Sequence, residues 1–583
     1  MNKLLSFFLF AVFVAVLRDL NLVEAAGLVL ALAVALVFPR FGDRFFRRSA
    51  DAARRVARRP ALAMIGVGAG VVAIRLLLLP WFPVPSPVIT DEYSHLLLAE
   101  TLTHARLTNP PHPMWQHFET IHVIFQPTYN SMYFPGQALF LAAGQAVFGS
   151  PWAGVLISTA LMTAAIFWML CSWFPNRWAL LGAVLAGLRF GIHSYWVNSY
   201  WGGAAPAFAG ALVLGASMRL YRKPQVRHAA VFGLGCFLLV NTRPFEGLAV
   251  IAPCLLLLAA AYLRAPSALR RPILLRAFVP VAIIGVLSGG WTAYYCWRVT
   301  GVPFRLPYQV NQAAYGWPAT LPFFETRPIA HRHPEMAAYY RWEMEEHQKL
   351  VRPLTHVSAN LADMVSLWSF YLGPSLTLFL LLAMSNRPWR RAGLLLAVVL
   401  LSLAAIGIEQ SRYPHYISPA TGAILGLVVL GMRSVAIGWR ADGRKGLALV
   451  RWSVVALVLV VSLRATFLQG QSYRNRYSGY LSWCCSREGD LGRLDAEHYL
   501  RNEPGKHLVI VRYGAGHHWM DEWVHNAADI DASRIVWARD LGPHRNADLI
   551  RYYKDRAVWL ATPPGSYALK PYLPEPAAVL TPR

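Results

Sequence analysis

Long runs of apolar residues alternate with short basic clusters along most of the chain. A helix needs about 17 to 25 apolar residues to cross a bilayer, and runs near this length recur up to residue 468. The predicted spans are 4–17, 22–38, 61–80, 151–172, 177–192, 204–221, 229–241, 247–263, 276–298, 361–383, 392–408, 417–436 and 447–468. The pattern predicts a mainly α, polytopic membrane protein with about 13 transmembrane helices. The short runs 229–241 and 247–263 could equally form one broken or re-entrant pair.

The basic residues decide the orientation. Lys and Arg outnumber Asp and Glu by 55 to 30, for a net charge of +25, and they gather in the links between apolar runs. An excess of Lys and Arg in short links is typical of the cytoplasmic face of a membrane protein, so nucleic acid is not an expected partner, whereas membrane lipids are. When the chain starts on the inner side, every cluster falls on the cytoplasmic side: 40–59, 219–227, 264–276, 387–391 and 440–445. The first of these predicts a surface helix against anionic lipid.

Three segments outside the membrane are then large: 81–150, 299–360 and the tail. We divide the chain into an N-terminal helical pair with its basic segment (1–60), a transmembrane catalytic domain (61–469) and a C-terminal soluble domain (470–583). Helices are predicted at 91–104 and 135–148. The tail predicts strands at 507–513, 534–538 and 557–561 with a helix at 547–556, which indicates a small α/β domain. In a bacterium this topology places the protein in the inner membrane, with the large segments in the periplasm.

The adjacent acids Asp91 and Glu92 follow the third span. One interpretation is structural, because Thr90 can cap a helix and acids in a first turn are stabilised by the helix dipole. The other is functional, because a charge beside lipid is costly and usually marks a site. His95 lies four residues after Asp91, on the same helix face. A carboxylate in this place can take the proton of an acceptor hydroxyl.

Two motifs carry a resemblance to a known family. Asp91-Glu92-Tyr93 opens a helix that continues Leu96-Leu97-Leu98-Ala99-Glu100, and Tyr133-Phe134-Pro135-Gly136-Gln137 precedes Val147-Phe148-Gly149. Over roughly residues 61–440 the chain resembles the GT-C class of polytopic glycosyltransferases, in the branch of protein O-mannosyltransferases and lipid A aminoarabinose transferases. The resemblance implies a sugar donor on a polyprenyl phosphate and a lipid, glycan or protein acceptor. It also implies that Asp91 is the catalytic base, with Glu92 in support and Tyr133 at the substrate site.

The chain departs from this family where the donor phosphate is held. Aminoarabinose transferases carry an acid and a Lys after the Tyr-Phe pair, whereas this chain has Pro135 and Gly136. Arg243 and Arg412 are the candidates to bind the phosphate instead, since a guanidinium donates two hydrogen bonds at once. Glu246 and Tyr413, from the same two segments, are further substrate-site candidates. Each arginine could also be an interfacial anchor, and Arg243 could pair with Glu246.

The remaining signals are weak. The aromatic run 193–203 predicts an interfacial belt, with sugar contact as the lesser alternative. The histidines of the loops match no metal-ligand spacing, so no metal site and no cofactor are predicted, and dependence on a divalent metal stays open. Six cysteines, with Cys484 and Cys485 adjacent, indicate no disulfide framework and no assignable role. Two rival functions remain: a lipid-linked saccharide transporter or flippase, and an O-antigen-ligase-like transferase.

Overall fold

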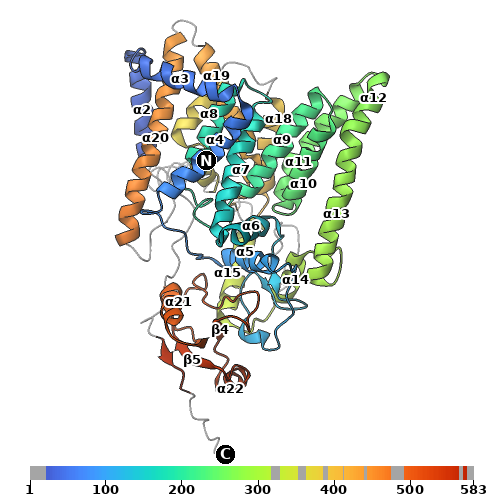
Figure 1. Cartoon of the computed structure of the whole chain (residues 1–583), viewed down its shortest axis with the longest axis vertical. Coiled ribbons are helices and arrows are strands. Elements are labelled where there is room, and N and C mark those ends of the chain that lie inside the picture. Colours follow the sequence, from blue (N-terminus) through green and yellow to red (C-terminus); the bar gives the residue numbers. More distant parts are fainter. Residues whose placement is uncertain are drawn as a thin grey trace, which may run out of the picture.

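The computed structural model describes residues 21–316, 329–351, 363–384, 392–410, 412–438, 443–474, 492–563 and 569–573. The predicted first span and the Cys484–Cys485 pair lie outside these ranges. A bundle of long helices forms the upper part of the molecule, and shorter helices and a small sheet lie below it (Figure 1).

The bundle is built from the helices of the predicted spans. They are α2 (Asn21–Val37), α4 (Pro60–Leu77), α7 (Pro151–Leu170), α8 (Asn176–Phe190), α9 (Ala204–Arg222), α10 (Val226–Val240), α11 (Pro244–Arg264), α13 (Val279–Thr300), α17 (Gly373–Met384), α18 (Gly393–Gly407), α19 (Thr421–Gly438) and α20 (Gly443–Arg474). Within the described ranges, seven helices are long and apolar enough to cross a membrane, or eight if one bent pair counts as a single span. The multi-pass character is confirmed, but the number thirteen is not, because several helices such as α10 and α18 are shorter than a bilayer requires.

One predicted span is broken. Residues 361–383 were predicted as one span, and within it the helical stretches 363–371 and 373–382 meet at 86°. Gly373 lies between them at φ +55°, a conformation that favours glycine. A fully buried ion pair fills the bend: Arg189 Nη1 lies 3.0 Å from Glu24 Oε2, and Arg189 also donates to the carbonyl of Phe370. A buried charge pair is tolerated only when such hydrogen bonds complete it.

The two ends of the bundle differ. Helices α3 (Asp43–Ala57) and α12 (Ser267–Ile273), from the basic clusters, lie at the upper end, and α5 and α6 lie at the opposite end (Figure 1). In α3 Phe46 is buried while its arginines are exposed, as expected for a helix on a surface. The aromatic segment 193–203 is not an exposed belt, since Tyr195 and Trp196 are buried in the protein core.

Below the bundle, α5 (Thr90–Thr103) and α6 (Gly136–Phe148) lie close to their predicted positions. The backbones of α6 and α7 touch, because a Cβ added to Gly144 would lie 2.1 Å from the nitrogen of Gly154. The same region holds the strands β1 (Val123–Ile124) and β2 (Asn130–Ser131) and the helices α14 (Pro307–Tyr315) and α15 (Pro334–Val351).

The tail is the small α/β unit that the sequence predicts. Strands β4 (Ile535–Arg539), β3 (Lys506–Val511) and β5 (Arg556–Ala561) are parallel in that order, and β6 (Lys570–Pro571) pairs antiparallel with β5. Helices α21 (Gly492–Asn502) and α22 (Pro543–Tyr552) belong to the same unit. It packs against the loop after α5, where His112 Nε2 lies 3.0 Å from Asp531 Oδ1.

Candidate active site

Asp91 lies in the first turn of α5, at the junction of the bundle and the lower part. Its side chain is 23% exposed. The hydroxyl of Tyr133 donates to its Oδ1 at 2.5 Å, and Nδ1 of His122 lies 3.5 Å from its Oδ2. The carboxylate is thus held by Tyr133, with His122 beside it, while part of it stays open to a substrate.

Glu92 points the other way, into the protein. Its Oε2 accepts the backbone N–H groups of Val88 and Ile89, and its Oε1 accepts that of Tyr200. Burial raises the pKa of Glu92 to about 7, and these hydrogen bonds oppose the shift. Glu92 therefore ties the start of α5 to the segment after α8, and it is placed to hold Asp91 in position.

A chain of hydrogen bonds begins at His122, whose Nδ1 lies beside Asp91 and is hydrogen-bonded to the hydroxyl of Thr90 at 2.9 Å. The other ring nitrogen of His122, Nε2, lies 2.8 Å from the hydroxyl of Tyr339, which donates to Glu343 Oε1 at 2.9 Å. The side-chain amide of Gln410 donates to Glu343 Oε2 at 2.5 Å. Burial raises the pKa of Glu343 to about 7. Asp91 and a second, buried carboxyl are therefore connected through one imidazole and one phenol.

His95 and Tyr133 form the wall beside Asp91. The two rings stack at 4.5 Å with an interplanar angle of 21°. Burial lowers the pKa of His95 to about 3; Asp91 opposes this shift, and Arg243 adds to it. The imidazole is therefore neutral at physiological pH. Asp91 and Arg243 both lie within electrostatic range of this ring.

Arg243 is the more accessible of the two candidate arginines. It precedes α11, its side chain is 21% exposed, and its Nη1 lies 3.3 Å from Glu246 Oε1. Its guanidinium also lies 4.2 Å from the ring centre of Tyr416. The alternative pairing with Glu246 is thus present, but a partly exposed guanidinium with further donors can still meet an anion.

Arg412 is placed differently. It is 4% exposed, and its Nη1 donates to Asp363 Oδ2 at 2.9 Å, so its charge is already neutralised by a carboxylate of the protein. Glu409 lies within electrostatic range of both arginines. Both its carboxylate oxygens are buried without a hydrogen-bond partner in the part of the chain that the structure describes.

Tyr413 lies on the same side as Asp91. Its ring stacks on His415 at 5.8 Å, and the residue is 41% exposed, so it is accessible to a substrate. Further residues of the site are Tyr339, Glu343, Tyr416, His122 and Tyr308, whose ring lies 5.7 Å from that of Tyr133. The sequence does not mark them, and His122 is only one of several loop histidines there. No local signal marks these residues, since each reaches the site through contacts between distant segments.

Solved structures provide the comparison with known proteins. The chain is similar to the oligosaccharyltransferase of Archaeoglobus fulgidus in complex with zinc and sulfate, at 12% identity over 86% of this chain and 67% of that one, with a TM-score of 0.46. It is also similar to ArnT from Cupriavidus metallidurans in the apo state, at 13% identity over 86% of this chain and 93% of that one, with a TM-score of 0.45. The structures that the chain is similar to thus include the transferase group that its motifs resemble.

At these identities and scores, the likeness assigns no function to any residue. No protein-family model matches the sequence, and a search of curated proteins finds no match. The roles of Asp91, Arg243 and their neighbours therefore depend on the geometry of this chain.

No metal centre can be assembled from the described ranges, where no three His, Cys, Asp or Glu side chains are grouped so that they could hold an ion. The groups that the site offers are one partly exposed carboxylate, two neutral imidazoles, several phenols and one accessible guanidinium. These can take a proton, donate hydrogen bonds to sugar hydroxyls and stabilise an anion.

Proposed function

We propose that this protein transfers a sugar from a polyprenyl-phosphate donor to a hydroxyl of an acceptor at the membrane surface. The observation that carries the proposal is the setting of Asp91. This partly exposed carboxylate accepts a hydrogen bond from Tyr133 and lies 3.5 Å from Nδ1 of His122, and His95 lies within electrostatic range of both Asp91 and the guanidinium of Arg243. A base and a cation are thus both present at this end of the apolar bundle.

In the proposed reaction, the acceptor oxygen forms a bond to the anomeric carbon as the bond from that carbon to the phosphate oxygen breaks. The electron pair of the broken bond leaves with the polyprenyl phosphate, and the hydroxyl proton passes to Asp91. Arg243 stabilises the departing phosphate. Arg412 is already paired with Asp363, and we assign it to holding the segment after α18 in place.

The hydrogen-bond chain provides a route for the proton. When Glu343 is ionised, Tyr339 donates to it, so Nε2 of His122 carries the ring proton. Nδ1 then accepts from the hydroxyl of Thr90 at 2.9 Å, and it has to leave Thr90 to take a proton from Asp91. A proton taken by Asp91 can pass to Nδ1 while Nε2–H passes its proton to Tyr339 and Tyr339 to Glu343. Asp91 is thereby returned to its basic form. The separation of 3.5 Å between Nδ1 and Asp91 has to shorten in the complex with substrate, as catalytic hydrogen bonds often do.

The basic clusters give the orientation that we propose. Helices α3 and α12 lie at the end of the bundle opposite α5 (Figure 1). Since Lys-rich and Arg-rich links face the cytoplasm, the site and the tail belong to the periplasmic side of a bacterial inner membrane.

The test measures polyprenyl phosphate, which every polyprenyl-phosphate sugar donor releases when its sugar is transferred. Purified protein is incubated with a lipid extract of its host membranes, and polyprenyl phosphate is measured by mass spectrometry together with the mass gained by acceptors. We expect polyprenyl phosphate to accumulate with the wild type and not with Asp91→Asn. Accumulation at the same rate in both, or in neither, would refute the proposal.

A further inference from the structure

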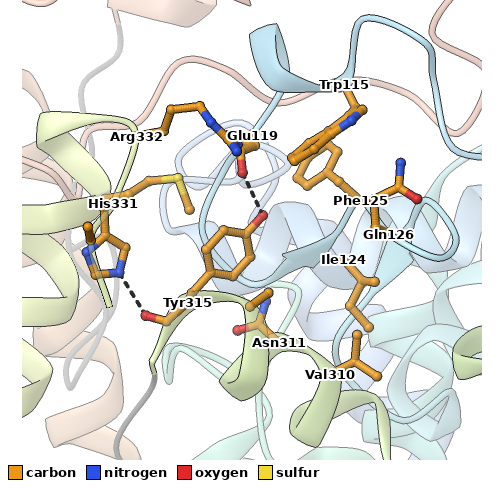
Figure 2. A pocket seen from close by; sticks show the side chains of 13 residues that line it. Trp115, Glu119, Ile124, Phe125, Gln126, Val310, Asn311, Tyr315, His331 and Arg332 are labelled. Atoms are coloured by element: carbon orange, nitrogen blue, oxygen red, sulfur yellow. Dashed lines mark hydrogen bonds and ion pairs between the residues drawn. The ribbon is translucent and has the colours of Figure 1, made fainter. Parts of the chain in front are cut away.

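A separate cavity of about 260 Å³ lies in the lower part, between the loop 115–126, α14 and the residues before α15 (Figure 2). Trp115, Phe125 and Tyr315 give it aromatic surface, and Glu119, Asn311 and Arg332 give it polar groups. The proposed mechanism uses none of these six residues.

The charged residues that line this cavity are paired with each other. Glu119 accepts hydrogen bonds from Tyr315 at 3.2 Å and from Arg332 at 2.7 Å, and His333 Nε2 lies 3.0 Å from the same carboxylate. The guanidinium of Arg332 lies 5.0 Å from the ring centre of Trp115. A lining with one carboxylate paired to one guanidinium has no formal charge to offer an anion, so it favours an uncharged polar ligand.

The cavity also presents unmatched amide groups. Asn311 is fully buried; its Nδ2 donates to the carbonyl of Val123 at 3.2 Å, but its Oδ1 has no hydrogen-bond partner among the described residues. A buried amide oxygen left without a donor costs free energy, which a ligand hydroxyl would recover. Gln126 lies exposed at the rim, where its amide can meet further hydroxyl groups.

We propose that this cavity is a subsite for one uncharged sugar ring of the acceptor. A sugar ring combines C–H groups, which pack on aromatic faces, with hydroxyl groups that donate and accept hydrogen bonds. The volume lies just below the range of roughly 300–1,000 Å³ that is typical of pockets for drug-sized ligands, so it suits one ring and not a longer saccharide.

The chain connects this cavity to the site around Asp91. Glu119 and Ile124 line the cavity, whereas His122, between them in the sequence, approaches Asp91. The same short segment thus forms one side of both places. The inference rests on the proposed function and makes it more specific: the acceptor is a saccharide or glycolipid, with one ring held here and a neighbouring hydroxyl presented to Asp91.

Binding can be measured without any transfer reaction. Purified full-length protein in detergent is titrated with methyl glycosides of glucose, galactose, mannose and N-acetylglucosamine, followed by saturation-transfer NMR. We expect saturable binding of at least one glycoside, weakened about tenfold by Trp115→Ala through the loss of the aromatic face. Trp297→Ala is the matched control, since it removes an exposed tryptophan of α13. If Trp115→Ala does not fold, Gln126→Leu at the exposed rim takes its place.

Three results would overturn the proposal: no glycoside saturates the wild type, the cavity variants bind as tightly as the wild type, or inorganic phosphate displaces the glycoside. Asp91→Asn separates this inference from the proposed function, because it should abolish transfer and leave glycoside binding unchanged. Glycoside binding in a wild type that transfers nothing would refute the function and keep the subsite. Transfer by a protein that binds no glycoside would refute the subsite and keep the proposed function.

Discussion

Replacement of Asp91 by Asn tests the catalytic role against the structural one. The amide oxygen of Asn can still accept the hydroxyl of Tyr133, and its NH₂ group can donate to Nδ1 of His122. A hydrogen bond to a charged group contributes about 1.5–3 kcal/mol and a neutral one about 1 kcal/mol, so the free energy of unfolding should fall by about 1 kcal/mol. The change keeps the shape of the site and removes only its basicity.

The expected effect on rate is far larger. Loss of a general base lowers rates by about 10²–10⁴-fold, which raises the activation free energy by about 3–5 kcal/mol. Release of polyprenyl phosphate from a membrane lipid extract measures the rate, and thermal melting in detergent measures stability. Asp495→Asn makes the same chemical change at an exposed position of α21 and serves as the control. If Asp91→Asn releases polyprenyl phosphate within a few-fold of the wild type, Asp91 is a capping residue and the assignment is wrong.

Three further predictions concern the cation, the proton route and the orientation. Arg243→Ala should weaken binding of a short-chain polyprenyl phosphate by about tenfold or more, and Arg243→Lys should weaken it less, because Lys keeps the charge and loses the forked donors. Equal binding by the alanine variant and the wild type would show that Arg243 is an interfacial anchor and does not bind the phosphate. Because burial raises the pKa of Glu343 to about 7, its carboxyl is protonated below that pH, and kcat/KM should rise as the pH increases through about 7. Glu343→Gln should remove this rise; a variant with the same pH dependence of kcat/KM as the wild type would exclude the proton route. A cysteine at Gln116 should react with a membrane-impermeant reagent added outside intact inner membrane, and one at Arg270 should not; the opposite result would reverse the topology.

The sequence predicts those parts of this structure that depend on local pattern. The helix α5 begins one residue before the predicted start, and the strands of the tail lie within a few residues of their predicted ranges, because span length, capping and strand composition are written in neighbouring residues. The same reasoning placed Asp91 at the mouth of the bundle. The roles of Asp91 and Arg243 stay predictions, and both residues lie within electrostatic range of His95.

The contacts that were not predicted join distant segments. Arg189 and Glu24, which fill the 86° bend, are 165 residues apart, and His122 and Tyr339 are 217 apart. The apolar run 361–383 does contain Gly373-Pro374, a dipeptide typical of turns, but nothing in it identifies the remote ion pair that lies at the bend. Arg412 was predicted to meet a phosphate because the sequence shows a cation at a span end but not the carboxylate that occupies it.

The packing of α5 against the tail has a consequence for the biosynthesis of this protein. The N–H of Ala528 donates to Glu100 of α5 across 428 residues of chain, and the ring of His525 stacks on Tyr93 at 3.9 Å. Chains fold from the N-terminus as they leave the ribosome, so α5 and its Asp91 emerge long before the tail residues that pack on α5. Membrane insertion can finish before the tail covers this face of α5. We therefore expect a chain interrupted before residue 525 to insert without acting on the lipid carriers around it.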